Sequence, residues 1–254
     1  MKSILFASAV AAAMLCAAPA LAATGQVDLS YSGDKISGGG SNENFDNINF
    51  GGAAAVNLSG NWNAQFDGHY DRITVGSDHE TFSNGDAHVF YRTPAWAVGG
   101  VVSVDNVEGA GLYSAGVEGQ AYLGQFQLGA NFTGGELDHS GGGNFSFYNG
   151  GVSGEYFVTP NLLVSLNGSA GQFSETGEHV NLSQVGVGAE WKTQFPASFF
   201  VSYNHQQLSD HGTVKDDTWA VGARWNFGSK TLKDRENSGA SFSTSSVLGL
   251  LGFL

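Results

Sequence analysis

The sequence is poor in cysteine, in charge and in long apolar runs. Its one cysteine, Cys16, lies in the N-terminal segment that we expect to be removed, so the remaining chain can hold neither a disulfide scaffold nor a cysteine-ligated metal. Charged residues make up only 13% of the chain and the net charge is −13, which argues against nucleic acid as a partner. Beyond the N-terminus no apolar segment is long enough for a transmembrane helix, and 38 glycines disfavour helices.

The N-terminus has the pattern of a secretory signal peptide. Lys2 supplies a short positive region, residues 4–18 form an apolar segment too short to cross a bilayer, and Ala-Leu-Ala at 20–22 fits the small-residue rule for cleavage. We therefore expect residues 1–22 to be a signal peptide and the mature chain to be exported. A retained N-terminal anchor is the alternative.

Apolar residues alternate with small polar residues through most of the remaining chain. In "WAVGARWNFG" (219–228) aromatic and aliphatic residues alternate with Ala, Gly, Arg and Asn, and "QFQLGANFT" (125–133) repeats the pattern. A period of two is typical of strands with one apolar face. About twelve such segments are present, each long enough for a tilted strand of about 9–11 residues to cross a bilayer.

Two kinds of break separate these segments. Short breaks, centred near 60, 94, 124, 160 and 196, contain Pro or Gly and recur at hairpin spacing. Longer polar segments lie midway between them, near 33–44, 76–81, 105–110, 135–143, 174–179 and 208–216. The regular order of short and long breaks predicts up-and-down hairpins, with short turns at one end and longer loops at the other.

The composition of the two strand faces indicates what surrounds the sheet. The polar faces are rich in Asn, Gln, Ser and Gly, whereas the surface of a soluble sandwich, the alternative, would normally carry more charge. Aromatic residues gather near the strand ends, as the two edges of a bilayer select. We predict a girdle of Trp62, Trp96, Trp191, Trp219, Trp225 and Phe227, with further aromatic residues towards the long loops: Tyr31, Phe50, Tyr70, Tyr113, Phe132, Phe173 and Tyr203. A sheet in hydrocarbon must close on itself.

The C-terminal segment also carries a family resemblance. "WAVGARWNFG" followed by "SKTLKDRENSGAS" is similar to the last strand and tail of small porin-like outer-membrane β-barrel proteins of alphaproteobacteria. The resemblance implies a single closed barrel in the outer membrane and a passive channel, without naming a solute. Such barrels usually end on an aromatic residue, which fits Phe227, but residues 228–254 follow it and Phe253 is the alternative terminal aromatic.

The polar faces of the strands predict the lining of the lumen. These residues are mostly short, with few bulky groups among them, which favours a narrow water path over a lumen plugged by loops or tail. Asp28 and Arg224 lie at similar distances from the ends of the first and last strands, so we expect them to pair where the barrel closes. The residues predicted to line the lumen are Asp28, Asn63, Asp67, Arg92, Glu118, Asn131, Glu155, Glu190, Lys192 and Arg224.

The candidates for chemistry are weaker. Acid–His steps lie in the polar segments at 78–79, 138–139, 178–179 and 210–211, but adjacent residues on a strand point apart, so one step is a poor chelate. His205 falls on the lipid-facing side with Tyr203, where an outer-membrane phospholipase would need a serine partner that is not evident. The chain shows no catalytic, cofactor-binding or metal signature.

We therefore predict an all-β protein of the Gram-negative outer membrane: a signal peptide at 1–22, a closed antiparallel up-and-down transmembrane β-barrel of about 12 strands at 23–228, and a periplasmic tail at 229–254. Its short turns face the periplasm and its longer loops the exterior. The predicted function is passive diffusion of small hydrophilic solutes and ions with mild cation preference, without cofactor or enzymatic activity. The alternatives are a non-conducting structural or surface-interaction barrel and, less favoured, a hydrolase. Expected partners are outer-membrane lipid, lipopolysaccharide, the barrel-assembly machinery and small solutes, not nucleic acid.

Overall fold

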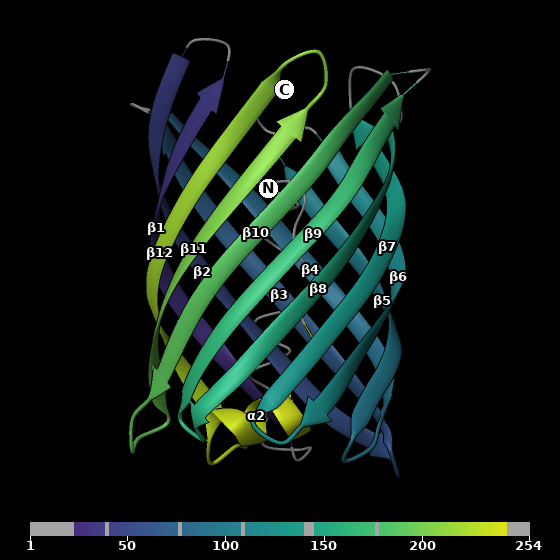
Figure 1. The fold of residues 1–254 in the computed structure, drawn as a ribbon, viewed down its shortest axis with the longest axis vertical. Helices are drawn as coiled ribbons and strands as arrows, with labels where there is room; N and C mark the ends of the chain where they lie inside the picture. The colour runs from purple at the N-terminus through teal and green to yellow at the C-terminus, as the bar shows by residue number, and fades with distance from the viewer. Residues whose placement is uncertain are drawn as a thin grey trace.

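A computed structural model describes residues 23–38, 41–75, 78–107, 110–139, 145–175 and 178–242. These residues form twelve strands and one short helix, which Figure 1 labels. The strands are β1 (Thr24–Gly38), β2 (Ser41–Ser59), β3 (Trp62–Val75), β4 (Asp78–Arg92), β5 (Trp96–Val107), β6 (Ala110–Leu123), β7 (Phe126–His139), β8 (Phe145–Thr159), β9 (Leu162–Glu175), β10 (Glu178–Lys192), β11 (Ala197–Ser209) and β12 (Thr213–Phe227). The helix is α2 (Leu232–Ser238).

The strands form one closed antiparallel barrel, in which each strand pairs with the next and β12 pairs with β1 (Figure 1). Closure leaves no open sheet edge, so every strand finds backbone partners on both sides. Asp28 is the Cα partner of Arg224 at the closing seam, and Oδ1 of Asp28 lies 3.9 Å from Nε of Arg224. The predicted closed antiparallel barrel is confirmed, and so is the pairing of these two residues.

The outer surface of the barrel is apolar because the alternation of the sequence survives in every strand. On β10, for example, Val185 and Val187 are each about half exposed, while the neighbouring Glu190 is buried. Large apolar side chains exposed around the whole wall form a surface far larger than a soluble protein normally presents. The predicted girdle residues Trp62, Trp96, Trp191, Trp219 and Trp225 are exposed on it, and Phe227 is half-buried.

The barrel has two distinct ends. β1 begins and β12 ends at one of them, which we call the tail end because α2 lies there (Figure 1). Tight turns join the strands at this end, and Gly60 and Gly124 take φ values of +58° and +71° in them. Only glycine adopts this left-handed backbone without strain. The short breaks in the sequence correspond to these turns.

The polar segments expected to be long loops at the opposite end are largely strand. β1 continues to Gly38 and β2 starts at Ser41, and β11 reaches Ser209 before β12 starts at Thr213. Paired strands satisfy backbone groups that a loop would leave to water. The wall of the barrel therefore extends further at this end than the sequence analysis expected, and the connections there are short.

The segment after the barrel departs from the predicted periplasmic tail. Residues 229–242 fold back into the tail end of the barrel, because Leu232 and Arg235 find buried partners there. The closing strand is β12, which ends at Phe227, and Phe253 lies outside the described residues, as do residues 1–22 with the expected signal peptide. Among the described residues, no helix has the length and apolarity to cross a membrane.

Candidate functional site

The barrel encloses a polar cavity of about 450 Å³. Amide and hydroxyl side chains from β7 to β11 form much of its wall, among them Asn131, Ser165, Asn167, Gln184 and Asn204. Carboxylates from other strands, Asp67 and Glu118, also line it. The described cavity lining is therefore mostly polar, with neutral and acidic side chains from the strands and with Arg224 and Arg235 as its basic groups.

The residues predicted to line the lumen all lie on the inner side of the wall. Six of them are buried among inward-facing neighbours, and Asn63 shares the inner face of β3 with Gln65. Three further residues, Asn131, Glu155 and Arg224, line the cavity. The six buried residues are Asp28, Asp67, Arg92, Glu118, Glu190 and Lys192.

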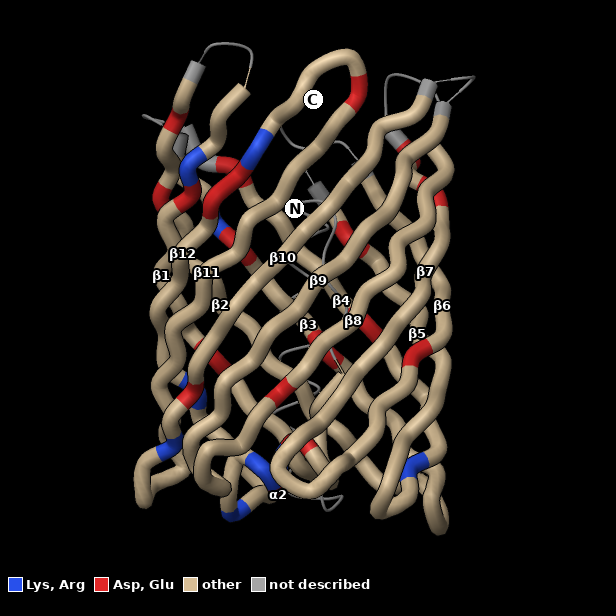
Figure 2. Tube along the Cα trace, viewed as in Figure 1, with Lys and Arg blue, Asp and Glu red and all other residues tan. Residues whose placement is uncertain are grey.

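Charge is distributed unevenly along the lumen (Figure 2). Every Lys and Arg of the described strands lies within three residues of a strand end, as Arg92 and Lys192 illustrate. Acidic residues such as Asp67 and Asp86 lie near the middle of their strands. Basic side chains of the described strands therefore lie only near strand ends, whereas acidic side chains lie both in the middle of the wall and, as with Asp216 and Asp217, towards the end opposite the tail.

The chain's own tail forms the floor of this cavity. Residues 235, 236 and 240–242 line it from below. Thr231 caps α2 by accepting a hydrogen bond from the backbone N–H of Asp234 at 3.0 Å. Leu232, fully buried, packs against Phe157 and Leu163 on the inner face of the barrel. A lumen plugged by the tail was the less favoured alternative from the sequence, because the tail carries no repeating pattern that would place it, and the structure agrees with that alternative at this end.

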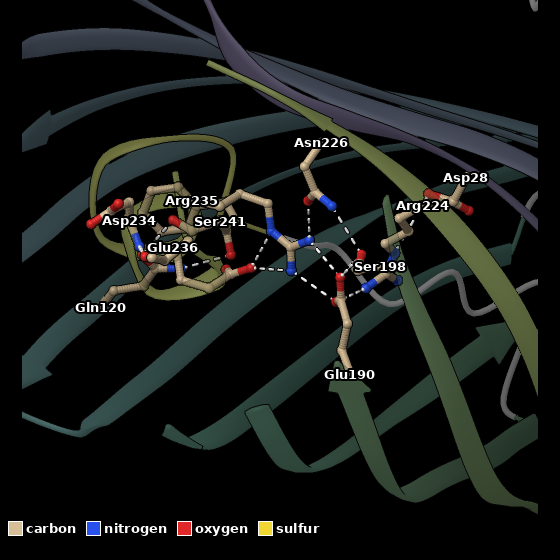
Figure 3. A network of polar contacts seen from close by, with 12 residues as sticks. Asp28, Gln120, Glu190, Ser198, Arg224, Asn226, Asp234, Arg235, Glu236 and Ser241 are labelled. Carbon is tan, nitrogen blue, oxygen red and sulfur yellow. Dashed lines mark hydrogen bonds and ion pairs between the residues drawn. The ribbon is translucent and has the colours of Figure 1, made fainter. Parts of the chain in front are cut away.

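Arg235 is the main polar anchor of the tail (Figure 3). Its side chain is 2% exposed, and its guanidinium donates to both carboxylate oxygens of Glu190 at 2.8 and 2.9 Å. It also donates to Asn226 at 2.8 Å and to Glu236 at 2.7 Å. Burial opposes the charge, but the carboxylates of Glu236 and Glu190 outweigh it and raise the pKa of Arg235 above its ordinary value. The tail is thus docked as a cation.

A second anchor holds the residues after the helix. Arg92 donates to the carbonyl oxygen of Gly239 at 2.8 Å and to the hydroxyl of Ser241 at 2.7 Å. Gln65 accepts from the N–H of Ser241 at 3.0 Å and donates to the carbonyl of Phe242 at 2.6 Å. The Phe242 ring packs on Phe90, with centroids 4.8 Å apart. Arg92 and Gln65 thus bind the tail backbone, while Phe90 holds its last described ring.

Towards the opposite end, inward-facing apolar side chains replace the polar lining. Two buried clusters lie there, and Ile36 packs against both, which joins them across the lumen. We call the joined set the apolar layer: Ile36, Phe45, Ile73, Phe82, Leu112, Leu137, Phe145, Phe147, Phe173, Val180, Leu182 and Leu208. It contradicts the expectation that few bulky groups point inward, and Phe173 faces the lumen and not the lipid. The cavity is bounded by the tail at one end and lies below this layer at the other.

The acid–His steps do not supply the side chains that lie close enough together to bind one metal ion. Asp210 and His211 pair at 2.9 Å on an exposed turn. Both side chains of the step at 78–79 lie outside the described side chains, and so does one side chain of each of the steps at 138–139 and 178–179. In the part of the chain that the structure describes, the group close enough to hold an ion is Asp67, Asp86 and His88. His88 and Asp86 share the strand parity of Arg92, which the sequence analysis had placed in the lumen, so parity alone would have found them.

His205 lies on the outer face, as the alternation predicts. Its Nδ1 is 2.8 Å from a carboxylate oxygen of Asp217, which also accepts a hydrogen bond from Tyr203 at 2.6 Å. In the described contacts of His205 the partner is this carboxylate and not a serine. The arrangement is a surface hydrogen-bonded triad without a nucleophile.

Solved structures similar to this chain are bacterial outer-membrane barrels. An outer-membrane channel from Pseudomonas putida F1 matches with a TM-score of 0.57 and 12% identity, over 81% of this chain and 95% of that one. The translocator domain of the autotransporter NalP from Neisseria meningitidis matches with a TM-score of 0.55 and 10% identity, over 87% and 97%. The KdgM porin matches with a TM-score of 0.50 and 11% identity, over 79% and 99%.

The fold is that of outer-membrane β-barrels. At 10–12% identity the likeness extends to the fold and not to the activity. No protein-family profile and no curated protein sequence matches the chain. Membership of the small porin-like proteins of alphaproteobacteria therefore stays a prediction. The similar structures support the outer-membrane type of barrel.

Proposed function

We propose that this protein is a porin-like channel of the outer membrane, through which small hydrophilic solutes and ions diffuse passively. The observation that supports this most is the polar cavity of about 450 Å³ inside a closed, lipid-compatible barrel. Short amide and hydroxyl side chains can replace part of a solute's hydration without holding it tightly. The same proposal treats the chain as a non-enzyme that meets lipid, lipopolysaccharide and the assembly machinery of the outer membrane.

The charge distribution favours cations. Carboxylates lie both along the middle of the strands and near their ends, whereas Lys and Arg of the described strands lie only near strand ends. A lumen lined by charge of one sign in low-dielectric walls raises the local concentration of counter-ions. We expect a mild preference because the cavity wall on β7 to β11 is mostly neutral.

With the tail docked and the apolar layer packed, this channel is in a closed state. Arg235 and Phe242 fill the tail end, and Ile36 bridges the two apolar clusters towards the opposite end. Conduction therefore requires the tail to leave and water to enter the apolar layer. The same two closures favour the second candidate function, a structural barrel that conducts nothing.

Planar-bilayer recording separates the two functions. We expect chain 23–228, refolded without its tail, to give larger and more frequent ohmic currents than chain 23–254. In a KCl gradient its reversal potential should show mild cation preference. A clear anion preference would contradict the charge argument.

A second variant addresses the apolar layer. In chain 23–228, Phe173→Ser and Leu208→Ser exchange two buried apolar side chains for hydroxyls that water can wet. If this folded variant also fails to conduct, the channel proposal is rejected and the structural barrel remains. Heat-dependent migration on gels establishes folding in each case.

A further inference from the structure

Two carboxylates and one imidazole meet on the inner wall formed by β3 and β4. Asp67 and Asp86 are direct Cα partners across these strands and are 4% and 6% exposed. His88 lies two residues further along β4 on the same face. One ligand atom from each of the three side chains lies within 4.8 Å of the other two. This spacing allows three side chains to coordinate one ion.

Glu118 on β6 holds His88 in the orientation that a ligand needs. Nδ1 of His88 lies 2.9 and 3.0 Å from the two carboxylate oxygens of Glu118. The opposite ring nitrogen, Nε2, then faces Asp67 at 3.1 Å. Metal-binding histidines commonly donate the N–H of their second nitrogen to a carboxylate, which fixes the tautomer and the ring direction. With its proton on Nδ1, His88 directs the Nε2 lone pair towards the aspartates.

A buried hydroxyl extends this group to the next strand. Ser103 on β5 is the Cα partner of Asp86, so Asp67, Asp86 and Ser103 form one row across three neighbouring strands. Ser103 is 6% exposed, and its Oγ has no hydrogen-bond partner within the described chain. A buried polar atom without a protein partner points to an unseen ion or water.

The charge of this wall also calls for a cation. Asp67, Asp86 and Glu118 carry three negative charges when ionised, and a protonated His88 would offset one. Gln65 donates to both oxygens of Asp67, at 2.8 and 2.9 Å, but it is neutral. Like charges directly opposite each other on neighbouring strands destabilise a sheet. A bound divalent ion would remove this repulsion.

We propose that Asp67, Asp86 and the Nε2 atom of His88 bind one divalent transition-metal ion inside the barrel, with Glu118 as the positioning residue. A mixed imidazole and carboxylate set suits ions such as Zn²⁺, Co²⁺ and Mn²⁺. Asp67 and Glu118 line the cavity, so the site faces the lumen. The Phe242 ring lies over His88, with centroids 6.0 Å apart, and places the tail next to the site. The sequence carries no metal motif here, because the ligands come from two strands.

Metal titration of the refolded chain 23–254 tests this proposal. Co²⁺ serves as the probe, since its visible absorption reports nitrogen and oxygen ligands, and elemental analysis after gel filtration counts bound Zn²⁺. We expect one ion per chain. His88→Gln and Asp86→Asn should each lower the Co²⁺ affinity at least about 100-fold, and Glu118→Gln should lower it about 10–100-fold while the visible spectrum stays similar.

Asp34→Asn is the matched control, because Asp34 is another inward carboxylate, paired with the hydroxyl of Thr218 at 2.6 Å and far along β1 from the group. This variant should bind Co²⁺ as the unchanged chain does. The proposal is overturned if the folded, unchanged chain retains no ion. It is also overturned if the His88→Gln variant binds Co²⁺ with unchanged affinity while its heat-dependent migration shows that it is folded. In that case His88 would serve only as a cation between the carboxylates of Asp67 and Glu118. If His88→Gln does not fold, the comparison of Glu118→Gln with Asp34→Asn decides in the same way.

Discussion

Arg235→Ala tests whether a buried guanidinium holds the tail inside the barrel. Arg235 is 2% exposed and binds Glu190, Asn226 and Glu236 (Figure 3). Breaking a buried ion pair typically costs about 3–5 kcal/mol because the remaining charge is left without its partner. Glu190 keeps Arg224 as a partner, so we take the lower end, about 3 kcal/mol. At about 1.4 kcal/mol per tenfold, the undocked population should rise about 100-fold.

Cysteine labelling measures this population directly. Ala240 is 5% exposed in the docked tail, and chain 23–254 has no cysteine, so Ala240→Cys introduces a single buried thiol. The thiol reacts with a soluble maleimide only when the tail leaves the lumen. We expect the labelling rate to rise about 100-fold when Arg235→Ala is added, in proportion to the undocked population. Unchanged heat-dependent migration would show that the barrel itself remains folded.

Lys233→Ala is the matched control, from the same helix and with the same loss of one positive charge. The described bond of Lys233 to the barrel is made by its backbone N–H, which donates to the carbonyl of Pro160 at 3.1 Å, and the substitution leaves that bond in place. Its labelling rate should equal that of the unchanged tail. Equally slow labelling of the Arg235 and Lys233 variants would refute the reasoning, because the guanidinium network would then contribute nothing to docking.

Two further predictions concern the wall of the barrel. Val187→Arg should block assembly, because a charge on the lipid face near mid-strand costs about 2–4 kcal/mol. Gln184→Arg, on the inner face of the same strand, should still fold. Equal heat-dependent migration of the two variants would mean that the two faces of the strand are assigned wrongly. Oxidation should cross-link Asp28→Cys with Arg224→Cys, which are Cα partners at the seam, but not Asp28→Cys with Ala220→Cys, four residues away on β12. A cross-link in the second pair as readily as in the first would show that the seam has another register.

The alternation of single strands was enough to place the lumen residues on the inner face. Each side chain in a strand points opposite to its neighbour, so one known position assigns all the others on that strand. Counting by twos from Ser165 also reaches Phe173, which the structure places in the apolar layer. Phe173 was predicted for the outer belt from its distance to the strand end alone, without this count. The wrong assignment of Phe173 was avoidable, because the alternation along its own strand already places it on the inner face.

The position of the tail had no such signal. Residues 229–242 contain one helix, α2, of seven residues, too short to show a periodic apolar face. Its docking depends on Glu190 of β10, on the turn at Pro160 and on Asn226 near the end of β12. These groups come together around Arg235 only when the barrel has closed and the strands are in place at its tail end.

The sequence by itself determined the membrane-crossing part of the strands, their number of about twelve and their two faces, because a period of two is a property of neighbouring residues and the lipid requires closure. It did not determine how far the strands extend at the end opposite the tail. The tertiary structure alone decided which inward side chains meet. Asp67, Asp86 and Glu118 converge on His88 through strand register, and Ile36 joins two clusters across the lumen. Register and curvature bring together residues far apart in the chain, and those encounters decide whether the lumen is an open path, a closed one or a site for an ion.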